Sequence, residues 1–190
     1  MELLLLVLGL ALWWIAHLQK SAGAPLRQKL IGALGADPFR GVISLLLVIS
    51  LVLIVVGWRS TTPVAVYEAP AWGSAVAMPL VLLALYLFVA SAQPSNVKRL
   101  LRHPQLTGLA VWALAHLLSN GDNRSLVLFG GLGLWALVEM PLINRRDGAR
   151  EQPEAVPMAA DVKLVVIAVV AFAVLFLVHP YLFGASPSPL

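Results

Sequence analysis

Six long apolar runs, separated by short polar segments, dominate the pattern of the chain. The runs are Leu3–Leu18, Gly41–Trp58, Ser74–Ala92, Leu106–Ser119, Ser125–Ile143 and Leu164–Phe183. A membrane-spanning helix needs roughly 20 mainly apolar residues, and continuous runs of this kind favour it over alternating strands. The pattern predicts an all-α, polytopic bundle of about six transmembrane helices, forming one domain over residues 1–190. The fourth run is short, so we expect its helix to begin near Pro104, since proline suits a first helical turn.

Composition supports a membrane protein and excludes several kinds of chemistry. The chain is 60% hydrophobic and 12% charged, and a soluble domain could not hide that much apolar surface from water. There is no cysteine, which excludes disulfides, thiolate catalysis and iron–sulfur clusters. Any metal would need histidine, carboxylate or carbonyl ligands. The first run is preceded by Glu2 and by no basic residue, so it is interpreted as a helix rather than a signal peptide.

Basic residues gather in alternate loops. Eleven of the thirteen lie in segments 19–40, 93–105 and 144–163, whereas only Arg59 and Arg124 lie in the others. By the positive-inside rule these three segments face the cytoplasm, which places both termini outside, in the periplasm of a Gram-negative cell. Charges confined to short loops set orientation, so we expect no nucleic-acid partner despite the net charge of +4.

Two apolar runs share a local motif. Gly9–Leu18 reads GLALWWIAHL and Gly108–Leu117 reads GLAVWALAHL, with seven of ten positions identical. The common spacing, Gly-x3-Trp-x3-His, puts the three residues on one helical face. The match indicates a shared functional face. An inverted repeat of three plus three helices is a second interpretation, and coincidence between two Leu/Ala-rich helices a third.

Of the four histidines, only His17 and His116 lie well inside apolar sequence. Ionisable groups at membrane depth are costly and usually face the bundle interior. From the helical rise, the two differ in height by roughly 10 Å, which would allow a haem between the first and fourth runs. The alternative is that both make interhelical hydrogen bonds, a common use of polar side chains in membranes.

The residues around this pair suggest how a flat ring could fit. Gly9 and Gly108 would leave room for it, and Trp13 and Trp112 would form aromatic walls. We therefore expect these two faces to pack antiparallel with their motifs inward. Glu139, near the end of the fifth run, is expected to reach toward Arg145 or Arg146 at the membrane surface, and a catalytic role is the alternative.

The stretch Leu101–Arg124, LRHPQLTGLAVWALAHLLSNGDNR, resembles the NnrU family. Phe129-Gly130, Trp135 and the terminal HPYLFG segment fit the same pattern. The resemblance covers nearly the whole chain. It implies a bacterial multi-pass inner-membrane protein associated with nitric-oxide and nitrite metabolism.

The NnrU family is in turn similar to 15-cis-zeta-carotene isomerases, which carry haem b. This similarity implies that His17 and His116 are the haem ligands. Ala113 replaces the cysteine that those isomerases have three residues before the second histidine, so a ligand switch through that thiol is absent. A more distant likeness, through Arg102-His103-Pro104 and Gly108, is to membrane methyltransferases that use S-adenosylmethionine.

Three functions follow from these observations. The first is a haem b protein that acts on, or senses, a lipid-soluble or gaseous ligand, with isomerase-like chemistry as one form. The second is a non-enzymatic accessory protein for denitrification. The third is the methyltransferase, which lacks support because the chain has no acidic segment in a cytosolic C-terminal part. The lipid bilayer is the expected partner in each, and the sequence leaves the oligomeric state open.

Overall fold

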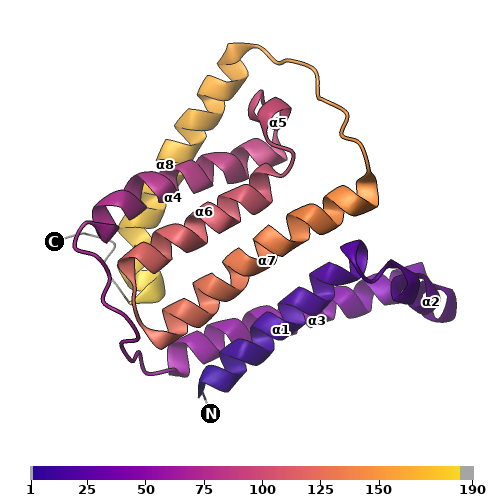
Figure 1. Cartoon of the computed structure of the whole chain (residues 1–190), viewed down its shortest axis with the longest axis horizontal. Helices are drawn as coiled ribbons and strands as arrows, with labels where there is room; N and C mark the ends of the chain where they lie inside the picture. The colour runs from indigo at the N-terminus through magenta and orange to yellow at the C-terminus, as the bar shows by residue number, and fades with distance from the viewer. Residues whose placement is uncertain (1, 185–190) are drawn as a thin grey trace.

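The computed structural model describes residues 2–184, which form eight helices (Figure 1). They are α1 (Glu2–Ser21), α2 (Ala24–Leu34), α3 (Ala36–Ser60), α4 (Gly73–Ala92), α5 (Val97–Leu100), α6 (Pro104–Ser119), α7 (Asn123–Asp147) and α8 (Met158–Phe183). The β-structure of the described residues is limited to one isolated bridge, Ala65 to Asp122. The helical membrane bundle expected from the apolar runs is confirmed.

Five of these helices, α1, α3, α4, α7 and α8, are long and apolar enough to cross a membrane. The helix expected from the fourth run, α6, begins at Pro104 as predicted and has 16 residues. At 1.5 Å per residue it spans about 24 Å, short of a hydrocarbon core about 30 Å thick. It nevertheless lies inside the bundle, since it packs against α4 on one side and α7 on the other.

The helices lie side by side in a fixed order. Figure 1 shows α8, α4, α6 and α7 in succession, followed by the hairpin of α1 and α3. The closest packing is within the pairs α1–α3 and α4–α6, and α7 contacts both α1 and α6. The outward sides of α3 and α8 expose many valines and leucines, as a lipid-facing surface requires.

Small residues allow α1 and α3 to approach closely. A Cβ on Gly57 would collide with the backbone of Leu6, and a Cβ on Gly9 would lie 2.8 Å from Ile54. The buried Ser50 hydroxyl donates to the Gly9 carbonyl at 2.8 Å. Small residues and interhelical hydrogen bonds are the usual means of helix association in lipid, where no hydrophobic force drives helices together.

Hydrogen bonds fasten loops at both ends of the bundle. We name the end formed by segments 19–40, 93–105 and 144–163 the basic end. There the Asn96 side chain exchanges hydrogen bonds with the backbone of Val156, at 2.8 and 3.1 Å. At the opposite end, the segment 61–72 lies along residues 120–123 through backbone bonds such as Val66 N to Gly121 O, 2.8 Å.

Two short helices at the basic end were not predicted. Segments 19–40 and 93–105 were interpreted as loops, but they contain α2 and α5. The prediction of helices relied on long apolar runs. Neither α2 nor α5 contains such a run, and neither has a buried residue.

Candidate functional site: two histidines on either side of α7

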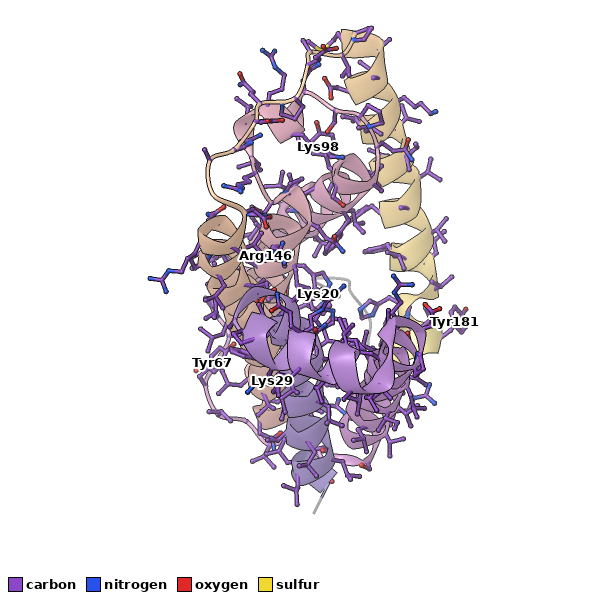
Figure 2. All side chains as sticks on the ribbon, turned by 90° about the vertical axis from the view of Figure 1, so that its right-hand side faces the viewer. Lys20, Lys29, Tyr67, Lys98, Arg146 and Tyr181 are labelled. Carbon is purple, nitrogen blue, oxygen red and sulfur yellow. The ribbon has the colours of Figure 1, made fainter. Side chains whose placement is uncertain are left out.

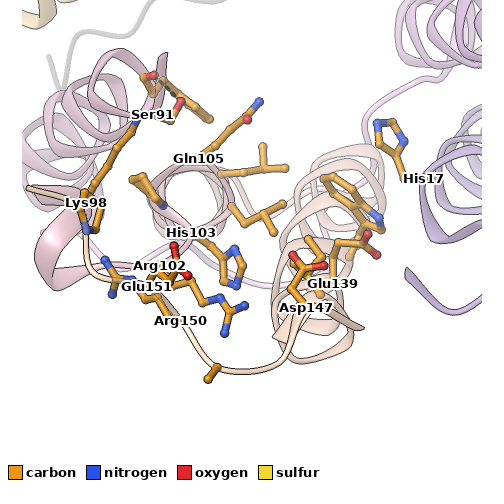
Figure 3. A pocket seen from close by; sticks show the side chains of 18 of the residues that line it. His17, Ser91, Lys98, Arg102, His103, Gln105, Glu139, Asp147, Arg150 and Glu151 are labelled. Carbon is orange, nitrogen blue, oxygen red and sulfur yellow. Dashed lines mark hydrogen bonds between the residues drawn. The ribbon is translucent and has the colours of Figure 1, made fainter. Parts of the chain in front are cut away.

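A cavity of about 910 Å³ leads from the basic end into the bundle. Its entrance carries charged side chains such as Lys98, Arg102 and Arg150, and its interior is lined by Trp13 and Trp135 among others. Figure 3 shows the charged groups at one end and His17 at the other, with Glu139 between them. This volume lies within the range of small-molecule and cofactor sites.

The ring of His17 is held in one orientation by α1 itself. Its Nδ1 lies 2.9 Å from the backbone oxygen of Trp13, one turn earlier. A carbonyl can only accept, so Nδ1 carries the proton and Nε2 keeps its lone pair. The ring also contacts the indole of Trp135 on α7, with centroids 4.8 Å apart.

His116 on α6 repeats this arrangement. Its Nδ1 lies 2.9 Å from the backbone oxygen of Trp112, so its Nε2 also keeps a lone pair. The ring stacks on Phe129 of α7, with centroids 4.4 Å apart. Metal-bound histidines commonly donate their second nitrogen to a backbone carbonyl, which fixes the tautomer and aims the free nitrogen.

The two histidines therefore face the same helix at different heights. Phe129 and Trp135 are six residues apart on α7, which corresponds to a rise of about 9 Å. This agrees with the height difference of roughly 10 Å expected between the histidines from sequence. Sequence reasoning had not assigned either aromatic residue a place beside a histidine.

The two tryptophans of the motif share a second cavity of about 330 Å³. Trp13 and Trp112 line it together with Leu132 of α7 and apolar residues of α3, α4 and α6. Trp13 also lines the larger cavity, so the two spaces adjoin at this side chain. His116 lines neither of these cavities, whereas His17 lines the larger one.

The expected role of the two glycines needs correction. Gly9 faces α3 at Ile54, and Gly108 faces α4, where a Cβ would lie 3.0 Å from the backbone oxygen of Ala84. Neighbouring helices fill the space that we expected for a flat ring, so both glycines serve helix packing. They also argue against an inverted repeat, because Gly9 of α1 faces the next long helix, α3, whereas Gly108 of α6 faces the preceding long helix, α4.

The direct packing expected between the first and fourth apolar runs is also wrong. In the described part of the chain, α1 packs along α3 and α7, and α6 packs along α4 and α7. The two motif helices run in opposite directions, as expected, with α7 in contact with both (Figure 1).

Glu139 does not reach the membrane surface as predicted. Its side chain is 5% exposed and accepts a hydrogen bond from the Ser21 hydroxyl at 3.0 Å. It lines the larger cavity between His17 and the entrance. Two indole nitrogens near it, those of Trp13 and Trp135, are buried and have no hydrogen-bond partner among residues 2–184. Both nitrogens are enclosed by protein atoms, and unpaired buried donors of this kind are costly.

A protein-family comparison identifies the chain. The model of the family described as NnrU protein matches residues 5–187. The chain belongs to the NnrU family. Searches of curated proteins and of solved structures found no match.

The segment that resembles membrane methyltransferases forms the entrance of the NnrU cavity. Arg102 donates to the backbone oxygen of Gly148 at 2.8 Å, and His103 Nε2 lies 2.9 Å from the side-chain oxygen of Asn144. These bonds tie the start of α6 to the end of α7. Ala113, which replaces the isomerase cysteine, is buried against Gly133 of α7.

Proposed function

We propose that this NnrU protein binds one haem b, which His17 and His116 would hold, and acts on a lipid-soluble or gaseous ligand. The observation that carries the proposal is the matched geometry of the two imidazoles. Each donates Nδ1–H to the carbonyl one turn earlier and keeps Nε2 free. Neutral imidazole in this form is a good iron ligand.

The surroundings of His17 fit a large cofactor with apolar sides. Trp13 lines both cavities, and Trp112 lines the smaller one. His116 stacks on Phe129 outside both cavities, so its ligation would accompany a rearrangement of that ring.

The protein's own groups would set the environment of the reaction. When bound, haem b supplies an iron whose redox and ligand-binding chemistry is tuned by its axial ligands and pocket. The two histidines would hold it, and the apolar walls at Trp13 and Trp112 would exclude water. Glu139, which accepts a hydrogen bond from the Ser21 hydroxyl at 3.0 Å, would present a polar carboxyl group to the cavity. The roles that fit this site are isomerase-like chemistry on a lipid-soluble compound and a function in nitric-oxide or nitrite metabolism.

Absorption spectroscopy tests the proposal. Protein purified from haem-replete cells is expected to show a Soret band of low-spin, six-coordinate iron, because two nitrogen ligands fill both axial sites. His17→Ala and His116→Ala should each abolish the band or convert it to a five-coordinate form. Leu114→Ala, on the exposed side of α6, controls for expression and stability. His103→Ala should leave the band nearly unchanged, because its Nε2 is engaged with Asn144.

A protein that shows no Soret band and takes up no added hemin would contradict the haem proposal. The non-enzymatic accessory function in denitrification would then be favoured. The methyltransferase is disfavoured, because the hydrogen bonds of Arg102 and His103 show a structural use for both.

A further inference from the structure

Helix α2 runs across the basic end of the bundle. Only two residues separate it from α1, and Gly35 alone separates it from α3. Helix α2 thus links the adjacent ends of the antiparallel neighbours α1 and α3, and it lies across this end of the bundle (Figure 2). Figure 2, which looks at this end, shows α2 in front, with Lys29 on it and Lys20 nearby.

One side of α2 is an exposed leucine stripe. Leu26, Leu30 and Leu34 recur every four residues and are 62%, 39% and 50% exposed. Gln28 and Gly32 lie on the opposite side of the helix. We call the three leucines the α2 stripe. A stripe of this kind on an unburied helix needs an apolar environment that the described residues do not provide.

The charges around the α2 stripe have one sign. Helix α2 contains Arg27 and Lys29 and no acidic residue, and Lys20 ends α1 beside it. Arg27 is turned toward the protein, over the ring of the buried Phe39 at 5.8 Å. The nearest acid along the chain, Asp37, is paired with Arg40 at 2.8 Å. Lys20 and Lys29 have no ion pair among residues 2–184, so they remain available to an anionic partner.

We propose that α2 is an interfacial helix that binds the anionic leaflet at the basic end of the protein. The α2 stripe lies in the boundary between headgroups and acyl chains, and Lys20 and Lys29 bind lipid phosphates. Apolar stripes flanked by lysine and arginine are typical of helices in the membrane plane. Anionic lipids attract basic residues that lie just outside a spanning helix. The exposed apolar side of α3, including Val42 and Leu45, continues this lipid contact into the bilayer.

Fluorescence of the full chain in vesicles tests this placement. Leu30→Cys and Gln28→Cys give matched sites on opposite sides of α2, and the chain has no other cysteine. Each variant is labelled with an environment-sensitive fluorophore, and the labelled protein is reconstituted in phosphatidylcholine vesicles that contain phosphatidylglycerol. We expect the fluorescence emission from the Leu30 site to be blue-shifted. A nitroxide attached to a lipid acyl chain close to the headgroup should quench it. The Gln28 site should be quenched by aqueous iodide.

A charge series tests the anionic partner. A variant that combines Leu30→Cys with Lys20→Gln and Lys29→Gln should show weaker nitroxide quenching at the Leu30 site in vesicles with phosphatidylglycerol. The matched pair Lys20→Arg with Lys29→Arg should retain the stronger quenching, and vesicles of phosphatidylcholine alone should remove the difference. Iodide quenching of the Leu30 site as strong as that of the Gln28 site would overturn the proposal. Protection of the Leu30 site from both quenchers would also overturn it, since protein would then cover the stripe. Equal quenching across the charge series would exclude the anionic partner.

Discussion

At the scale of single residues, each tryptophan–histidine pair is organised by its own helix. The backbone carbonyl of Trp13 or Trp112 fixes the histidine one turn later, and the two rings pack at 4.3 and 4.7 Å. An aromatic residue of α7, Trp135 or Phe129, contacts both rings of each pair. The sequence spacing predicts the first contact, because residues four apart share a helical face. The second contact joins residues more than a hundred positions apart for His17, and no local pattern encodes it.

A second residue of interest, Tyr67, fastens the end opposite the basic one. Its hydroxyl donates to the backbone oxygens of Leu117 and Asn120. Burial, followed by the charge of Asp122, raises the pKa of Tyr67 above its ordinary value. A pKa that is higher in the folded state means that the protonated phenol stabilises the fold. This contribution is complete below the unfolded-state pKa near 10 and is lost as pH rises through the folded-state value.

We therefore expect Tyr67 to make the unfolding temperature sensitive to alkaline pH. Below about pH 10 the native protein should unfold at a higher temperature than Tyr67→Phe, because the variant lacks the phenol hydrogen bonds. Above this pH the difference should shrink. Thermal unfolding in detergent across this range measures it, and a difference that is constant with pH would contradict the assignment.

At the scale of helices, the apolar runs predicted the spans but not their neighbours. Continuous hydrophobicity marks a helix that crosses lipid, whatever surrounds it. Which helices pack together depends on where small residues lie. The sequence does not distinguish a small residue at a helix–helix contact from one beside a cofactor. Gly9 and Gly108 were expected to border a cofactor, but their neighbours proved to be α3 and α4. Glu139 was likewise placed at the surface because the sequence did not reveal its bond to Ser21.

Two glycines of α3 give a matched test of this packing. A Cβ on Gly57 would overlap the backbone of Leu6, whereas a Cβ on Gly41 meets nothing within 4 Å. Gly57→Ala is expected to destabilise the protein by about 1–3 kcal/mol through overpacking. Gly41→Ala should be neutral or stabilising by up to about 1 kcal/mol, because alanine favours the helix. Thermal unfolding of both variants in detergent decides the matter, and equal effects would show that α1 and α3 do not approach this closely.

At the scale of the whole molecule, the charge distribution predicts an orientation. The basic end holds eleven of the thirteen lysines and arginines, so it should face the cytoplasm of a bacterial inner membrane, with both termini outside. Glu68 and Glu154 are exposed at opposite ends. In spheroplasts, Glu68→Cys should react with a membrane-impermeant maleimide, and Glu154→Cys should react only after permeabilisation. The cysteine-free native chain is the blank, and the reverse labelling pattern would refute the orientation.

The position of α7 between α1 and α6 also constrains how the protein is made. The N-terminal part of a chain leaves the ribosome first, so α1 and α3 can pair before α7 has been synthesised. At that stage His17 lacks the Trp135 ring that later lies against it, and His116 lacks Phe129. Any molecule that requires these walls can enter only after α7 has been inserted. Loading of a molecule of this kind would thus be a late event of biogenesis, since a ribosome-bound chain that stops before α7 lacks Phe129 and Trp135.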